Sequence, residues 1–130
     1  MADRTLRRLW AYLPNGVRIS GKFAVGATGA VGAITAIGIA SITRTAAGKY
    51  SVVMSDRFAD LYLESISLVS SATVGDGENL MVQFNSYSAA TKTFTFVCNP
   101  SGASQATETD PASGDEIHFA VVGRNTGIPR

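Results

Sequence analysis

Two residues hold most of the reactive potential of this sequence, because the chain has one histidine, His118, and one cysteine, Cys98. Cys98 ends the alternating segment KTFTFVC, which is typical of a strand, and a nucleophilic cysteine needs a base partner that this pattern does not supply. We therefore interpret Cys98 as a small buried hydrophobe. His118 alternates with apolar residues, which places it on the more exposed face of a strand. A pair with Asp115 or Glu116 is conceivable, but the pattern does not indicate catalysis.

The carboxylates form two groups whose spacing invites a functional interpretation. Asp56, Asp60 and Glu64 recur every four residues, which would align them on a helix, yet the β pattern around them breaks that geometry. Asp76 and Glu78 lie in a DGEN segment that superficially resembles a calcium loop. Its spacing does not continue to the bidentate Glu of an EF-hand, so a turn is the better interpretation. The sequence predicts no metal site.

Enzymatic and cofactor motifs are absent from the rest of the sequence. No serine lies in the G-x-S-x-G elbow of a hydrolase. Gly26, Gly29 and Gly32 invite comparison with a phosphate-binding loop, but neither Gly-Lys-Ser/Thr nor G-x-G-x-x-G occurs in the chain. We predict that the protein is not an enzyme, has no catalytic residues and binds no cofactor.

Positive charge is concentrated at the N-terminus. Residues 1–22 have a formal charge of +4, although the whole chain has only +1. The charged residues of this segment are Asp3, Arg4, Arg7, Arg8, Arg18 and Lys22. This asymmetry favours an arm that lies against an acidic partner, and a solvated tail is the alternative. The arm lacks the interleaved aromatics of a nucleic-acid platform, so we expect no specific nucleic-acid binding, while nonspecific phosphate contacts remain allowed.

Residues 4–13, RTLRRLWAYL, have the spacing of a short amphipathic helix. Its apolar stripe consists of Leu6, Leu9, Trp10 and Leu13. A helix of this length is marginal alone, so it must order by docking on its own domain or on a neighbour. Its bases and aromatics are the candidate partner-binding residues: Arg4, Arg7, Arg8, Trp10 and Tyr12.

The elements that position these residues are predicted to be strands. From residue 37 the apolar pattern has period two, with strands over 37–45, 49–54, 61–70, 80–87, 92–98 and 116–124. Residues 46–48 form a hairpin turn, and residues 55–60 a turn or one helical turn. The fold class is therefore an all-β antiparallel sandwich or barrel-like domain, with an extended or short-helical N-terminal arm. At 130 residues the chain fits one domain. We assign 1–22 to the arm and first strand, 23–124 to the β domain and 125–130 to a tail.

Two further segments need an interpretation. Residues 23–43 are uncharged and long enough to span a bilayer. Their many Gly, Ala and Thr residues favour strand, tight loop and strand instead, and the segment lacks the layout of a secretory signal. We predict no membrane association. Residues 99–115, with two prolines and two glycines, are predicted to form a long surface loop that is functional or mobile.

The segment ASITRTAAGKYSVVMSDRFADLYL, followed later by DPASGDEIHFAVVGRN, resembles a recurrent pattern in small structural proteins of tailed bacteriophages. In that pattern a strand ending in T-R-T turns through a Gly and returns as a Tyr-Val strand. The domain then closes on a DP-x-SG loop and a last strand ending in Arg-Asn. The matching positions include Thr43, Arg44, Thr45, Arg124 and Asn125, and the resemblance assigns them no chemistry.

The resemblance implies a virion component. Such proteins are β-rich, often trimeric, and use terminal arms to lace neighbouring capsomers. The first hypothesis is a capsid decoration or cement protein that is assembled in the host cytoplasm, binds the major capsid protein and forms a homo-oligomer, with a trimer favoured. The alternative is a tail-fibre or baseplate module that binds a host receptor or glycan through the 99–115 loop.

Overall fold

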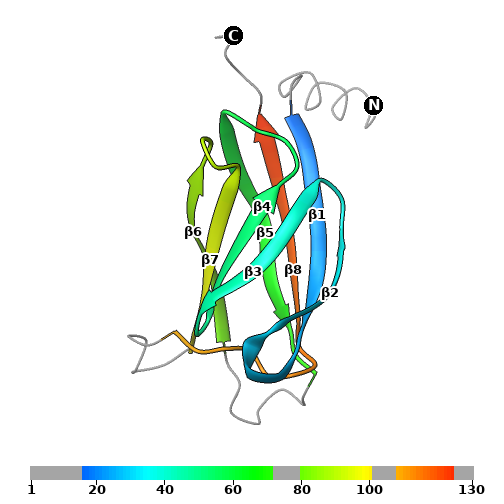
Figure 1. Cartoon of the computed structure of the whole chain (residues 1–130), viewed down its shortest axis with the longest axis vertical. Helices are drawn as coiled ribbons and strands as arrows, with labels where there is room; N and C mark the ends of the chain where they lie inside the picture. Colours follow the sequence, from blue (N-terminus) through cyan, green and yellow to red (C-terminus); the bar gives the residue numbers. More distant parts are fainter. Residues whose placement is uncertain (1–15, 72–79, 101–107, 125–130) are drawn as a thin grey trace, which may run out of the picture.

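The computed structural model describes residues 16–71, 80–100 and 108–124, and it confirms the all-β sandwich (Figure 1). The elements of these residues are β1 (Gly16–Val25), η1 (Ala27–Gly29), β2 (Val31–Ala36), β3 (Ile39–Ala46), β4 (Lys49–Met54), β5 (Asp60–Val69), β6 (Leu80–Ser88), β7 (Thr93–Pro100) and β8 (Glu116–Arg124). The predicted N-terminal helix and the C-terminal tail lie outside the described residues.

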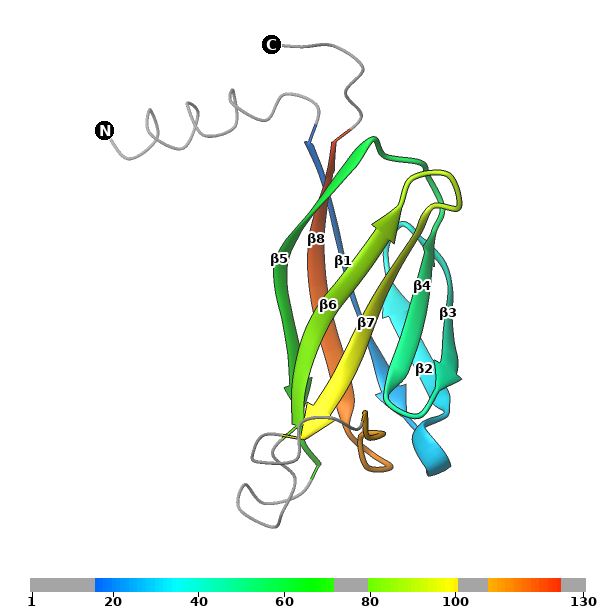
Figure 2. The same cartoon turned by 90° about the vertical axis from the view of Figure 1, so that its left-hand side faces the viewer.

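Two four-stranded antiparallel sheets form the two layers of the sandwich (Figure 2). Sheet I has the order β2-β1-β8-β5, and sheet II has the order β3-β4-β7-β6. The last strand, β8, lies between β1 and β5, and Gly16 pairs with Arg124. The described chain therefore begins and ends at the same end of the sandwich.

The predicted strands agree closely with the observed ones. The strands predicted over 49–54 and 116–124 match β4 and β8 at both ends, and the other predicted strands differ from β3, β5, β6 and β7 by one or two residues at their ends. Residues 55–59 connect β4 to β5 without a helical turn, and they bury Phe58. Period-two alternation located these strands because one face of each is buried in a common core.

The uncharged segment over 23–43 forms strands and tight connections, as predicted, but it holds parts of three strands rather than two. It contains the end of β1, η1, β2 and most of β3. The border predicted between residues 22 and 23 falls inside β1, so residues 16–22 belong to the sandwich. In the part of the chain that the structure describes, no helix has the length and apolar character needed to cross a membrane.

An aromatic cluster fills the space between the two sheets. Tyr50 stacks on Phe96 with ring centroids 5.3 Å apart, and Phe23 of the facing sheet lies 5.4 Å from Tyr50. Phe94 meets Phe119 edge to face at 5.8 Å. All but Phe119 are fully buried, and Phe119 is nearly so. Burial raises the pKa of Tyr50, whose hydroxyl donates a hydrogen bond of 2.8 Å to the carbonyl oxygen of Gly29.

Asp110 fastens the chain before β8 to sheet II. Its carboxylate accepts hydrogen bonds from Arg44 Nε at 2.9 Å, from Arg44 Nη2 at 2.7 Å and from the backbone N–H of Gly48 at 2.8 Å. Gly48 has φ +64°, and a Cβ there would lie 2.8 Å from the carbonyl oxygen of Cys98. Gly29 has φ +75°, and a Cβ there would lie 2.3 Å from Asp110 Oδ1. Glycine is therefore required at both positions.

Asp115 makes a second fastening and is fully buried. It accepts hydrogen bonds from Ser71 N at 2.8 Å, Ser71 Oγ at 3.0 Å and Ala112 N at 3.0 Å. Its own backbone carbonyl accepts from Val25 N, and Gly114 N donates to Val25 O, both at 2.8 Å. The DPASGD segment thus joins the end of β1 to the end of β5.

The prediction of a single surface loop over residues 99–115 is corrected at both of its ends. Asn99 and Pro100 belong to β7, and residues 108–115 are fastened to the sandwich. Pro111 is buried, and Thr109 N donates to the carbonyl oxygen of Cys98 at 2.9 Å. The composition indicated a loop correctly, but it does not reveal that two of its aspartates find donors far away in sequence. Residues 101–107 lie outside the described part of the chain.

We expect Asp115→Ala to lower the free energy of unfolding by about 3 kcal/mol, because two backbone N–H groups and a hydroxyl lose a shared buried acceptor. Urea denaturation followed by far-UV circular dichroism measures the loss. The matched control is Asp56→Ala at an exposed position, expected to change stability by less than about 0.5 kcal/mol. Equal effects of the two substitutions would contradict the role given to Asp115.

The Arg44–Asp110 pair predicts a specific pH dependence. The hydrogen bonds from Arg44, supported by that from Gly48, hold the pKa of Asp110 below its ordinary value of 3.8. A carboxylate with a lowered folded-state pKa stabilises fully at neutral pH, and the stabilisation is lost as the pH falls below 3.8 toward the folded-state pKa. Asp110→Asn should therefore cost about 2 kcal/mol at neutral pH and progressively less in acid. A cost that stays constant down to about pH 2.5 would contradict this account.

Candidate functional site

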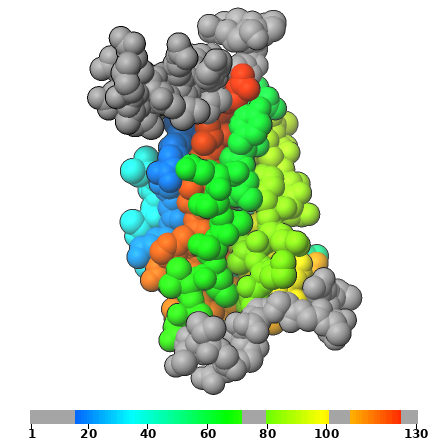
Figure 3. All heavy atoms as spheres, turned by 180° about the vertical axis from the view of Figure 1, so that it is seen from behind, coloured from blue at the N-terminus to red at the C-terminus, as the bar shows by residue number. Residues whose placement is uncertain are grey.

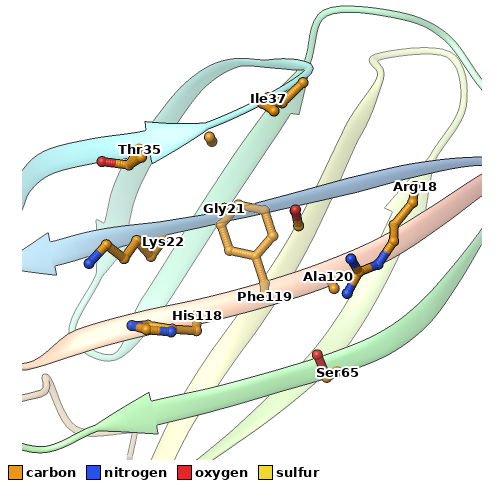
Figure 4. A pocket seen from close by; sticks show the side chains of 11 residues that line it. Arg18, Gly21, Lys22, Thr35, Ile37, Ser65, His118, Phe119 and Ala120 are labelled. Carbon is orange, nitrogen blue, oxygen red and sulfur yellow. The ribbon is translucent and has the colours of Figure 1, made fainter.

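The outer face of sheet I carries a shallow hollow with a floor of small side chains. Ser20 of β1, Ala120 of β8 and Ser65 of β5 lie side by side across three neighbouring strands. Figure 3 shows this face of the molecule, and Figure 4 shows the hollow from close by, with Arg18 and Lys22 beside it. Its volume is about 450 Å³. Because the central side chains are short, the longer charged side chains around them form a rim.

Ion pairs between strands build this rim. Arg18 Nε donates to Glu64 Oε2 at 2.8 Å, and Lys22 Nζ lies 3.0 Å from Glu116 Oε2. Glu64 occupies an irregularity of β5, where the register with β8 shifts between residues 63 and 65. Both pairs are exposed, so each contributes little to stability. Their main effect is to give this face equal numbers of paired acids and bases.

His118 lies on the same exposed face, as its alternation predicts. Its Nε2 is 3.3 Å from Glu116 Oε2, the oxygen that also contacts Lys22. The hydrogen bond from Lys22 is the main cause that lowers the pKa of Glu116, and His118 adds to it. The side chain of His118 is 43% exposed. The hollow thus offers a partner charges of both signs around a small-residue floor, and the prediction that the chain is not an enzyme stays a prediction.

The outer face of sheet II has the opposite character. The register places rows of small uncharged residues across the four strands, for example Thr43, Ser51, Thr95 and Ser86. Ser86 Oγ and Thr95 Oγ1 are 2.7 Å apart and hydrogen-bonded. Lys49 is a charged residue at one end of this face, where it pairs with Glu108 at 3.4 Å. The two faces of the sandwich therefore differ in charge and in the contacts they can make.

Exposed apolar side chains gather on sheet I. Seven large hydrophobic residues are exposed within the described part of the chain: Val17, Ile34, Ile37, Tyr62, Leu63, Val69 and Met81. All except Met81 belong to sheet I or to the turn after β2. Tyr62 lies under Arg124, whose guanidinium is 6.0 Å from the ring centroid, and a second hollow of about 370 Å³ adjoins it. Exposed apolar side chains make sheet I the better candidate for a contact face.

The candidate partner-binding residues Arg4, Arg7, Arg8, Trp10 and Tyr12 lie outside the described residues. The charge assigned to their segment can nevertheless be refined. Arg18 and Lys22, counted with the arm, are paired with acids of sheet I. The charge left for a partner is that of residues 1–15, which is +2 from three arginines and Asp3.

The acidic groups found in the sequence do not form a metal site in the described structure. Asp60 and Glu64 lie on strand β5 rather than on a helix. Across residues 16–71, 80–100 and 108–124, no three His, Cys, Asp or Glu side chains are grouped to hold a metal ion. Asp76 and Glu78 fall in the range 72–79, which is not described.

One residue of the T-R-T motif, Arg44, has a structural role, because it binds Asp110 of the DPASGD segment. Sequence reasoning missed this pair because the two residues are 66 positions apart. Arg124 also acts in a contact, since its Nη1 donates to Tyr62 Oη at 3.3 Å. In a single sequence, an arginine in a strand and an aspartate before a proline are weak signals of an ion pair, because neither residue indicates which residue it binds.

Comparisons of the chain with protein-family models, with curated proteins and with solved structures found no match. Function is therefore inferred from the sequence pattern and from the geometry of the two outer faces.

Cys98 is fully buried, as predicted, and burial raises the pKa of its thiol to about 12. We expect the native protein to resist thiol reagents at about pH 8, where the reactive thiolate is scarce and inaccessible. The measurement is the rate of reaction with a disulfide reagent, which should increase steeply when denaturant unfolds the chain. A fast native reaction would contradict the buried position.

Proposed function

We propose that the protein is a structural component of a bacteriophage virion, a decoration or cement protein that binds the major capsid protein and stabilises the head. The observation that supports it best is the position of Gly16 beside Arg124 at one end of a self-contained sandwich. The basic segment of residues 1–15 joins the domain at that end. A domain with this layout can bind a partner through its arm without opening its core.

The length of the segment fits this role. Fifteen residues reach up to about 50 Å when extended, which is enough to pass from one subunit of a shell to the next. Its arginines suit an acidic surface, because Arg remains charged and binds carboxylates through two hydrogen bonds. The strands that form the core pair with one another within residues 16–124. In this proposal the arm binds the partner, and the sandwich folds independently of that binding.

Homo-oligomer formation, with a trimer favoured, belongs to the same proposal. Sheet I is the better candidate for subunit contact, because its strands carry five of the seven large hydrophobic residues exposed in the described structure, and a sixth, Ile37, lies in the turn after β2. Its paired acids and bases can also meet a neighbour without net repulsion. Sheet II, with small uncharged outward residues, is the candidate for the surface that remains exposed on the particle.

A second candidate function is a tail-fibre or baseplate module that binds a host receptor or glycan. It is favoured by the position of the strand ends that flank residues 72–79 and 101–107. β5 and β7 end, and β6 begins, at the end of the sandwich opposite Gly16 (Figure 2). Because residues 108–115 are fastened to the core, the contact in this alternative is confined to the remaining part of the loop.

We expect the double charge reversal Arg4→Glu/Arg7→Glu to weaken binding to phage heads by about ten-fold or more, because the arm loses its attraction to an acidic capsid surface. Cosedimentation with heads of the phage that encodes this chain, prepared without the protein, measures binding. The charge-matched control is Arg57→Glu/Lys92→Glu, which changes two bases outside the arm, the exposed Arg57 and the half-buried Lys92. The control should bind heads as the unmodified protein does.

The outcome also separates the two candidate functions. Unchanged head binding by the arm variant would overturn the role given to residues 1–15. Binding of the isolated protein to host cells, with no affinity for heads, would overturn the cement assignment and favour the receptor-binding module. Circular dichroism of every variant verifies that the sandwich is folded.

A further inference from the structure

At the second hollow of sheet I, the side chain of Leu63 is exposed although it lies on the face of β5 that points toward the core. Leu63 pairs with the fully buried Val121, so alternation directs both toward the space between the sheets. Leu63 is nevertheless 40% exposed, and the adjacent Tyr62 is 47% exposed. β5 is an edge strand whose register shifts at Glu64, next to Leu63. At this point the described residues leave the apolar interior partly uncovered.

The uncovered region lies close to the start of the described chain. Tyr62 pairs with Val122, two positions along β8 from Arg124, which is the partner of Gly16. Gly16 and Tyr62 are two inter-strand spacings apart across the sheet and two residues apart along the strand direction. Their Cα atoms are therefore separated by roughly 12 Å. Pro14 and Asn15 span about 7 Å, and a ten-residue helix adds about 15 Å. A helix over residues 4–13 of the same chain would therefore be long enough to reach the hollow.

The segment has the composition that this region lacks. At 100° per residue, its apolar residues Leu6, Leu9, Trp10 and Leu13 fall within one stripe of the helix. A hollow of about 370 Å³ lined by Tyr62, Leu63, Glu64 and Val122 suits a large aromatic anchor such as Trp10. A helix this short is marginal alone and gains most of its stability from such packing.

On a helix over residues 4–13 the arginines would occupy the side opposite the apolar stripe. Arg4, Arg7 and Arg8 fall between about 100° and 200° from the centre of the apolar stripe at Leu6. When the stripe faces the sandwich, these side chains face away from it. They then form a basic surface at the end of the domain where Gly16 and Arg124 lie.

We propose that residues 4–13 fold back onto their own domain, with the apolar stripe seated on the hollow at Tyr62 and Leu63 and the three arginines displayed to an acidic partner. The inference deepens the proposed function, on which the identity of that partner rests. In place of an extended arm that reaches the next subunit, it gives the domain a fixed basic surface that the capsid partner must approach. The contact itself requires no capsid and is testable on the isolated protein.

Trp10 is the only tryptophan of the chain and reports on this contact directly. We expect blue-shifted emission in the full-length protein, and acrylamide quenching about three-fold weaker than in a peptide of residues 1–15, because the indole is buried. Tyr62→Ser/Leu63→Ser, and more mildly Leu63→Ser alone, should return quenching toward the peptide value. The matched control is Met81→Ser, which changes an exposed apolar residue of sheet II.

Peptide-like quenching in the unmodified protein, or quenching that the Tyr62 and Leu63 variants leave unchanged, would overturn the proposal. A mixing experiment tests whether the segment seats on a second copy instead. The Tyr62→Ser/Leu63→Ser protein is mixed with excess Trp10→Phe protein, whose hollow is intact. Docking within one chain leaves Trp10 exposed in the mixture, and restored shielding would overturn it in favour of a neighbouring copy. Neither result depends on head binding, so failure here is distinguishable from failure of the cement assignment.

Discussion

The bonds of Asp110 hold together parts of the chain that the two sheets alone would leave separate. Its carboxylate joins Arg44 of β3, the turn at Gly48 and the segment that leads into β8. Charge-assisted hydrogen bonds to an arginine fork fix geometry as well as energy. Because β8 pairs with both β1 and β5, the segment that leads into it connects the centre of sheet I to this contact on sheet II.

The two outer faces show how one small core can support different surfaces. Both sheets contribute aromatic residues to the interior, and this shared burial supplies most of the stability. The outward positions are then free of packing constraints, so sheet I can carry ion pairs and exposed apolar residues while sheet II carries small uncharged ones. The charged rim of the first hollow on sheet I comes from the side chains that alternate outward.

The sequence was sufficient to locate the strands from β3 onward, but it gave no bounds for β1 and β2 and was insufficient for the connections. Period two located β4 and β8 to the residue, and it placed Cys98 inside and His118 outside, because alternation is a local property. Asp110 and Asp115 were hidden in a segment with loop composition, since their donors are remote in sequence. The pairing of Arg18 with Glu64 was hidden for the same reason, and it reduced the charge assigned to the arm. The hollow beside Tyr62 depends on a register shift in β5 that no spacing rule reveals.

The adjacency of Gly16 and Arg124 has a consequence for how such a domain can be reused. Chain ends that emerge side by side let a domain be grafted into a surface loop of an unrelated host protein without stretching either partner. The opposite end of the sandwich then points away from the host. Gene fusion or recombination can therefore move this domain from one protein to another while it keeps the same orientation relative to its host. The loops at the opposite end of the sandwich can vary without changing the point of attachment.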